Sequence, residues 1–144
     1  MENHFELTNQ EFEQQFESTT LPPHLFSHEA HLRLAWIHIK KYGVEKAIEN
    51  VSSQIKAFAI RHGDRKKFNV TLTAAAVRAV YHFLLKSQSN NFKDFINEFP
   101  RLKTSFKDLI NSHYSGNIFA SPLAKEILLE PDLLPFDEIQ PKDK

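Results

Sequence analysis

The sequence predicts a single all-α domain, an irregular bundle of about six to seven helices around a central helix hairpin. Apolar residues recur at helical spacing through most of the chain, and no segment alternates apolar and polar residues as a half-buried strand does. Three glycines in 144 residues are few for the hairpin turns of a sheet. A chain of this length is expected to form one domain with a core of ordinary size.

The first two helices are marked by their N-terminal signals. Thr8-x-x-Glu11 has the spacing of a capping box and predicts a short helix to about Ser18. Ser27 is a candidate N-cap for a second helix over 28–42. Apolar side chains cover most of this second helix, so we expect it at the centre of the bundle.

Gly43 is the only residue between the 28–42 helix and a helix predicted over 44–62, whose apolar residues recur at i, i+3, i+4 and i+7. Glycine is the preferred residue just after a helix C-terminus. So short a junction predicts that the two helices form an antiparallel hairpin.

The later helices are expected to be shorter and to be separated by Asn, Ser and Pro. We expect them from a cap at Thr71 or Thr73 to about Ser87, over 92–99, over 102–113, and from Ser121-Pro122 to about Leu129.

The net charge of zero is the sum of three unequal segments. Residues 1–32 carry six acids and no Lys or Arg, residues 33–107 carry a net +10, and residues 108–144 carry a net −4. This pattern predicts that acidic ends fold onto a basic middle.

We expect residues 1–144 to form one domain with two appendages. The first is the acidic N-terminal segment, residues 1–20, and the second is a Pro-rich extended tail, residues 130–144. The tail is expected to pack through three apolar side chains, Leu133, Leu134 and Phe136.

Several classes of function are excluded by composition. The chain has no Cys, so a disulfide, a cysteine nucleophile and a thiolate metal site are ruled out. Gly43, Gly63 and Gly116 are too far apart for a dinucleotide fingerprint, a Walker A loop or a G-x-S-x-G elbow. No export signal or membrane-spanning run is present, and the expectation is a cytoplasmic protein with no membrane partner.

The eight histidines are the most informative residues for chemistry. His28 and His31 are spaced i, i+3 on one helix, close enough to bind one divalent metal such as zinc or iron. His38 returns to the same side of that helix, and His82 lies within the fourth predicted helix, so either is a candidate third ligand. The alternative is that His28 is hydrogen-bonded near the helix start while His31 and His38 lie at the edge of the core.

Residues 61–67 contain Arg61, Arg65, Lys66 and Lys67, the densest basic cluster of the chain. Such a cluster is able to bind phosphate or nucleic acid, but no recognised nucleic-acid motif accompanies it and the sequence pI is about 7.1. We therefore favour a solvated loop, or a docking surface for the acidic N-terminal segment, over a nucleic-acid partner.

Four segments of the chain resemble a known group of proteins. They are FSHEAHL (26–32), FNVTLT (68–73), HYS (113–115) and SPLAKEILLEPDLLP (121–135). In that order they are similar to W-T-H-x-x-H-L, Y-H-E-T-x-T, Y-Y-S, and S-x-x-A-R followed by E-P-D-L-x-P, in a group of small uncharacterised bacterial all-helical proteins. The resemblance implies a shared helical fold and supplies no activity.

The resemblance also bears on the metal hypothesis. In the group, H-x-x-H together with the His-Glu before the fourth helix implies three or four metal ligands. This chain matches at His28 and His31, but Asn69 and Val70 stand in place of the His-Glu pair. A metal site would then need His24, His38 or His82 as a substitute ligand.

Two main hypotheses for function follow, and neither assigns a catalytic residue. The first is a module that binds a small ligand or a protein partner, needs no cofactor, and has a polar pocket formed by His28, His31, Asn69, Thr71 and Tyr114. The alternative is a metal-dependent enzyme that uses His28 and His31 with His82 or His38 as ligands. Weak nucleic-acid binding through residues 61–67 is a third.

Overall fold

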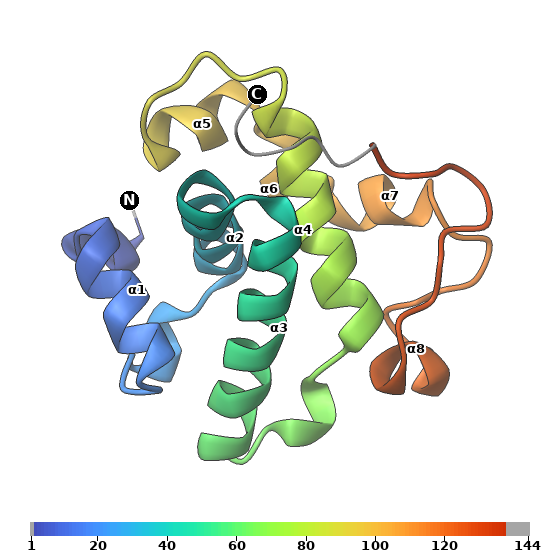
Figure 1. Cartoon of the computed structure of the whole chain (residues 1–144), viewed down its shortest axis with the longest axis horizontal. Coiled ribbons are helices and arrows are strands. Elements are labelled where there is room, and N and C mark those ends of the chain that lie inside the picture. Colours follow the sequence, from blue (N-terminus) through green and yellow to red (C-terminus); the bar gives the residue numbers. More distant parts are fainter. Residues whose placement is uncertain (1, 138–144) are drawn as a thin grey trace.

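The computed structural model describes residues 2–137, which form one helical bundle, and the all-α prediction is confirmed (Figure 1). Within these residues there are eight α-helices, three short 3-10 helices and no strand. The α-helices are α1 (Asn9–Glu17), α2 (His28–Tyr42), α3 (Val44–Arg61), α4 (Val70–Leu84), α5 (Phe92–Glu98), α6 (Arg101–Thr104), α7 (Phe106–Asn111) and α8 (Pro122–Glu126). The 3-10 helices are η1 (Asn3–Glu6), η2 (Pro23–Leu25) and η3 (Arg65–Lys67).

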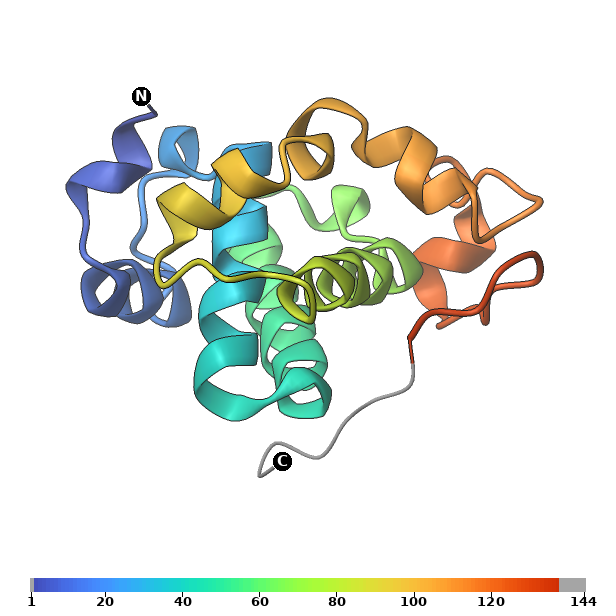
Figure 2. The same ribbon diagram turned by 90° about the horizontal axis from the view of Figure 1, so that it is seen from above.

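Helices α2, α3 and α4 pack against one another and form the centre of the molecule (Figures 1 and 2). Gly43 joins α2 to α3 with φ at 86°, in the left-handed region that glycine adopts without strain, and its amide donates to the Ile39 carbonyl. Ten residues of α2 between Glu29 and Ile39 are buried, and His31 is the one residue in this stretch that is not fully buried. The predicted central hairpin is confirmed.

The N-terminal segment is part of the core, so its description as an appendage was wrong. The predicted capping box of α1 is present: the Thr8 hydroxyl accepts from the Glu11 amide, and the Glu11 carboxylate accepts from the Thr8 amide. Phe12 and Phe16 of this helix are both fully buried. Burying two Phe side chains favours docking by several kcal/mol, on the order of 2–3 each, which exceeds what capping alone supplies.

Helix α4 begins earlier than predicted because its N-cap is Asn69 and not Thr71 or Thr73. The Asn69 side-chain oxygen accepts from the Leu72 amide, and its amide nitrogen donates to the Ile118 carbonyl 2.8 Å away. The second bond joins residues far apart in sequence, so capping signals alone did not identify this residue. The helix also ends at Leu84, before the predicted Ser87.

The helix predicted over 102–113 is two helices, α6 and α7, divided at Ser105, where φ is −132°. The break lets Leu102 and Ile110 both reach the core, where each is fully buried. Ser121 caps α8 as expected, but α8 ends at Glu126 because the following backbone bonds to α4 instead of continuing the helix.

Residues 130–137 form no helix, bend at 132–134, and pack differently from the prediction. Leu133 and Leu134 are 60% and 52% exposed, whereas Phe136 stacks on the His113 ring at 3.9 Å. The rest of the tail lies outside the described residues. No helix of the described part is long and apolar enough to span a membrane.

Candidate functional site

A cavity of about 370 Å³ opens between α2, α3 and α4, closed on one side by the chain around Phe106 and Phe119. Most of its lining is apolar, which is typical of small-molecule sites. The apolar lining comprises Leu32, Ala35, Val51, Ile55, Phe68, Leu72, Ala76, Val77, Phe106 and Phe119. Its polar lining includes His28, His31 and Asn69, three residues that the sequence indicated. We call it the His31 cavity.

His31 is held by α2 and by an aromatic neighbour. Its Nδ1–H donates to the Ser27 carbonyl at 2.8 Å, one turn back, and its ring stacks on Phe26 at 3.6 Å between centroids. Burial and, to a smaller extent, the nearby His28 lower the pKa of His31 from 6.5 to about 4 despite the opposing hydrogen bond to Ser27, so the ring is neutral at pH 7.

The tautomer of His31 follows from these contacts. A neutral imidazole that donates from Nδ1 has an unprotonated Nε2, which is a hydrogen-bond acceptor. Within residues 2–137 this Nε2 has no hydrogen-bond partner. Because the residue lines the cavity, Nε2 is the acceptor that remains for a bound molecule.

His28 lies at the mouth of the cavity, where the residue is exposed. Its Nε2–H donates to the Leu102 carbonyl at 3.1 Å, and the edge of its ring contacts Phe106 at 4.7 Å. Both contacts join α2 to the α6–α7 region. His28 therefore shapes the entrance and keeps only Nδ1 for other interactions.

Asn69 and Thr73 line the cavity but have no free polar atom toward it. Both side-chain groups of Asn69 are used, one in the α4 cap and the other at the Ile118 carbonyl. The Thr73 hydroxyl donates to the Asn69 carbonyl at 2.8 Å. A hydroxyl that donates to a carbonyl and has no base beside it is not activated as a nucleophile.

Thr71 and Tyr114, which we expected in the same pocket, do not line this cavity. The Thr71 hydroxyl donates to the Ile127 carbonyl at 2.7 Å and accepts from the Leu129 amide at 2.9 Å. The Tyr114 hydroxyl donates to the Leu129 carbonyl at 3.1 Å. These residues attach the chain after α8 to the bundle, a structural role that spacing along the sequence does not reveal.

Two of the three candidate third metal ligands, His38 and His82, make their contacts in other parts of the bundle. His38 is 1% exposed, its Nδ1 accepts from the Asn50 amide, and its ring lies against Tyr42. His82 donates from Nδ1 to Asp137 at 2.6 Å and lines a separate cavity between α4 and α7. His28 and His31 thus gain no third His, Asp or Glu from the described residues. The metal-dependent enzyme stays a hypothesis without a ligand set.

A second polar cluster, which the sequence did not indicate as a site, joins η1, α2 and α6. Within residues 2–137 it holds the one group of three potential metal ligands, Glu2, His4 and Glu29. The Lys103 ammonium lies 3.1 Å from Glu2 and 2.9 Å from Glu29, so a protein cation already occupies the space between the carboxylates. We call these residues, together with Arg33, the N-terminal polar cluster.

The polar groups of this cluster are all paired. His4 donates to Glu29 at 2.7 Å, and Arg33 donates to the carbonyls of His4 and Leu7 at 2.7 and 2.8 Å. Burial lowers the pKa of His4, although Glu29 opposes this effect. The uneven distribution of charge along the sequence is the one feature that indicated this cluster. Here acids of residues 1–32 pair with a basic residue of 33–107.

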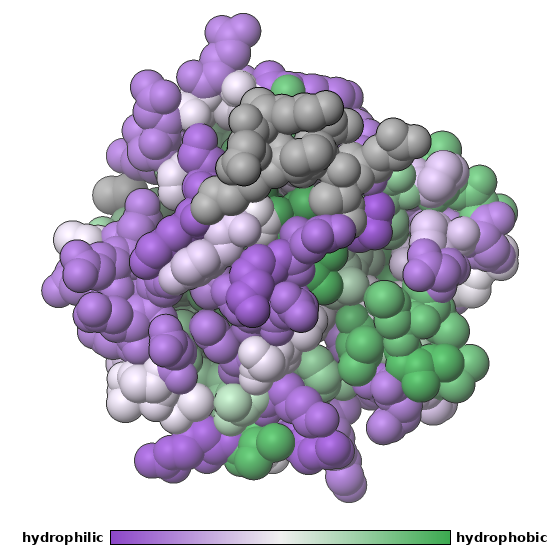
Figure 3. All heavy atoms as spheres, in the orientation of Figure 1, coloured by the Kyte–Doolittle hydropathy of each residue, from purple (hydrophilic) through white to green (hydrophobic). Residues whose placement is uncertain are grey.

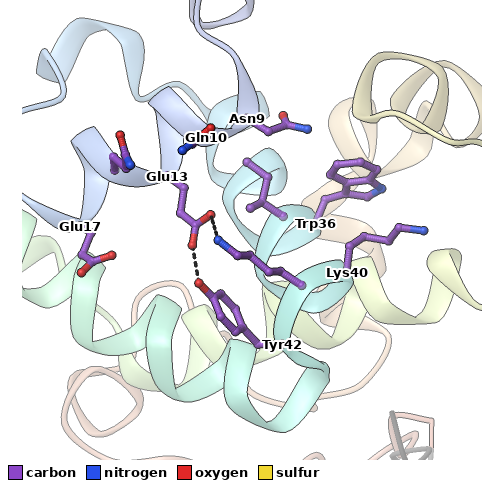
Figure 4. Close-up of a pocket in the computed structure, with 10 residues that line it drawn as sticks. Asn9, Gln10, Glu13, Glu17, Trp36, Lys40 and Tyr42 are labelled. Atoms are coloured by element: carbon purple, nitrogen blue, oxygen red, sulfur yellow. Dashed lines mark hydrogen bonds and ion pairs between the residues drawn. The ribbon is translucent and has the colours of Figure 1, made fainter. Parts of the chain in front are cut away.

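A groove of about 580 Å³ lies between α1 and α2 (Figure 4). Its buried carboxylate, Glu13, accepts hydrogen bonds from Lys41 at 3.0 Å and from the Tyr42 hydroxyl at 2.6 Å. These two bonds outweigh burial and hold the pKa of Glu13 below its ordinary value. The groove is open and its buried charge is compensated, which indicates a helix-joining role for Glu13.

No protein-family model matches this chain, and no match is found among curated proteins or among solved structures.

Proposed function

We propose that this protein binds a small, mostly apolar molecule in the His31 cavity, with His31 as the residue that orients it. One observation carries the proposal: a neutral imidazole lines an apolar cavity with its acceptor nitrogen unpaired. A hydrogen bond from a ligand donor to this nitrogen contributes about 0.5–1.5 kcal/mol to binding. The ligand is therefore expected to carry an N–H or O–H group within its apolar body.

Binding is favoured over catalysis because the lining of the cavity has no carboxylate and no activated hydroxyl beside His31. The Thr73 hydroxyl and the Asn69 amide are both committed to backbone carbonyls. His28 uses its Nε2 in the same way. An acceptor in an apolar enclosure supports orientation of a ligand, whereas catalysis needs at least one further positioned group.

Fluorescence titration with N-phenyl-1-naphthylamine tests the proposal, because this probe is neutral and apolar and has one N–H. We expect saturable binding that Ala76→Phe weakens at least tenfold, since Ala76 lines the cavity and a larger side chain would fill it. Leu72→Trp, from the same helix, provides a second blocking variant. Binding that both folded variants leave unchanged contradicts the proposal.

A surface control is needed because this chain has exposed apolar side chains. Leu123, Ile127 and Leu128 are 55%, 48% and 53% exposed, and hydrophobic surface gathers over α8 (Figure 3). Leu128→Ser reduces this surface without touching the His31 cavity. The proposal expects this variant to bind the probe as the parent protein does.

His31→Phe tests the hydrogen bond itself. Phenylalanine keeps the stacking on Phe26 but has no acceptor nitrogen. We expect about tenfold weaker binding of the probe, the equivalent of one lost hydrogen bond. The matched control is His24→Phe, at an exposed histidine outside the cavity.

A further inference from the structure

One wall of the His31 cavity is formed by residues 67–69, which are the last residue of η3 and the two residues that follow it. Lys67 lines the cavity, and its side chain is 82% exposed. Its nearest acid is Asp64, 3.8 Å away and 54% exposed. Solvent screens such a pair strongly, so Lys67 remains able to attract another anion.

A second depression, of about 330 Å³, lies on the other side of the same wall. Phe68 lines both spaces, and the neighbouring residues alternate between them: Lys66 and Val70 line the second, Lys67 and Asn69 the first. The second depression is lined by four cationic side chains, Lys56, Arg65, Lys66 and Lys125, and by one acid, Glu126. Figure 1 places this region where the end of α3, η3 and the start of α4 meet.

These four cations have no ion-pair partner in the part of the chain that the structure describes. The printed sequence adds a fifth nearby, Arg61, at the end of α3. Like charges gathered on one edge repel one another and raise the local potential, which an incoming anion relieves. The edge is therefore a favourable place for the charged group of a ligand.

Building on the proposed function, we infer that the ligand is an amphipathic anion. Its apolar body, with a hydrogen-bond donor, fills the His31 cavity, and its carboxylate, sulfonate or phosphate lies at Lys67 within the field of Arg65 and Lys66. Neutral His31 orients the body, so the lysines and arginine supply the positive charge. A nucleic acid would use the same cations, but it would leave the apolar cavity empty, which is why the amphipathic anion is favoured.

A matched pair of probes separates the two parts of this inference. 1-Anilinonaphthalene-8-sulfonate and N-phenyl-1-naphthylamine share the same aromatic body and N–H, and only the first carries an anionic group. We expect the sulfonate probe to bind at least fivefold more tightly at low salt. This advantage should shrink as sodium chloride is raised to about 0.5 M, because salt screens the exposed cations.

Charge reversal tests the role of the cations. The double variant Lys66→Glu with Lys67→Glu is expected to lower the affinity for the sulfonate probe at least tenfold and to change the affinity for the neutral probe less than twofold. The control, Lys46→Glu with Lys93→Glu, makes the same change in net charge on α3 near Gly43 and on α5, and should leave both affinities unchanged.

The outcomes distinguish failure of the inference from failure of the proposed function. Equal affinities for the two probes, unaffected by charge reversal but abolished by Ala76→Phe, overturn the anionic ligand and leave the cavity as a binding site. If Ala76→Phe leaves the affinity for both probes unchanged, both the anionic ligand and the proposed binding in the His31 cavity are overturned. Displacement of the sulfonate probe by a single-stranded oligonucleotide, with no effect of Ala76→Phe, replaces the inference with nucleic-acid binding.

Discussion

The N-terminal polar cluster and the His31 cavity both bring histidines into the bundle, and they differ in how their polar atoms are satisfied. In the cluster, His4 uses both ring nitrogens: Nε2 donates to Glu29 and Nδ1 accepts from Arg33 at 3.2 Å. In the cavity, His31 uses only Nδ1. The first arrangement is complete without a ligand, and the second is not.

Whether the polar atoms have hydrogen-bond partners distinguishes a structural cluster from a binding site more clearly than the types of residue do. Glu2, His4 and Glu29 have the composition of a metal site, but Lys103 and Arg33 compensate their charges. His31, by contrast, lines an apolar cavity, and its Nε2 has no hydrogen-bond partner among the described residues.

Arg33→Ala should have the largest effect, because it removes the cation at the centre of the closed cluster. Arg33 is 4% exposed and donates to two backbone carbonyls and to Asn9. Its loss leaves buried acceptors without partners and should lower the free energy of unfolding by about 3–5 kcal/mol, measured by urea denaturation. Lys46→Ala, at an exposed pair with Glu49, is the control and should cost about 0.5 kcal/mol or less. A cost for Arg33→Ala as small as the control's would mean that the cluster does not stabilise the fold.

Asn69→Ala tests whether a satisfied residue of the cavity wall behaves like the cluster. This variant loses the α4 cap and the hydrogen bond to the Ile118 carbonyl, so the free energy of unfolding should decrease by about 2–3 kcal/mol. Asn69→Ser keeps a capping oxygen and should recover about 1 kcal/mol of this. Equal stabilities of the two variants would show that the cap is unimportant here.

The pH dependence of stability should report the His31 environment. In the unfolded chain this histidine has a pKa near 6.5, whereas in the folded protein its pKa is about 4. The free energy of unfolding should therefore be unaffected by His31 above about pH 6.5 and should decrease as the pH falls from 6.5 to 4. His31→Phe should remove part of this fall, on the order of 2 kcal/mol at pH 4 relative to pH 7, allowing for partial exposure of the ring. His24→Phe is the control. The same slope in His31→Phe and the parent protein would argue against a neutral, buried His31.

Added metal should have the smallest effect. Because Lys103 lies between Glu2 and Glu29, and because His28 and His31 each donate one ring N–H to a carbonyl, zinc or iron should shift the melting temperature by less than about 1 °C. Differential scanning calorimetry with and without the metal measures this. A larger rise that His28→Ala removes would support the metal-dependent enzyme and reverse the comparison.

Local signals were sufficient for most of the helices. The capping box at Thr8, the cap at Ser27 and the turn at Gly43 were each read correctly, because their determinants lie within a few residues. The start of α4 was misplaced by two to four residues, since Asn69 is chosen as the cap partly by a bond to Ile118. The break at Ser105 was missed because helical periodicity continues through it.

The candidate site could be predicted from the sequence only in part. The i, i+3 spacing placed His28 and His31 on one side of α2, and both line the cavity. Nothing local indicated that Phe106 and Phe119 would close it, or that Thr71 and Tyr114 would instead hold the chain after α8. Contacts between residues this far apart depend on how the helices pack.

The all-α fold, the central hairpin at Gly43 and the pairing of N-terminal acids with the basic middle segment could be predicted from the sequence, although the acids meet Lys103 and not the predicted cluster at 61–67. Helical period, caps and charge act over short range or without direction, so they can be read along the chain. The packing of the helices determines that His4 uses both ring nitrogens whereas His31 uses one. Hydrogen bonds are directional and short, and whether His4 or His31 finds a second partner depends on the elements that pack against it.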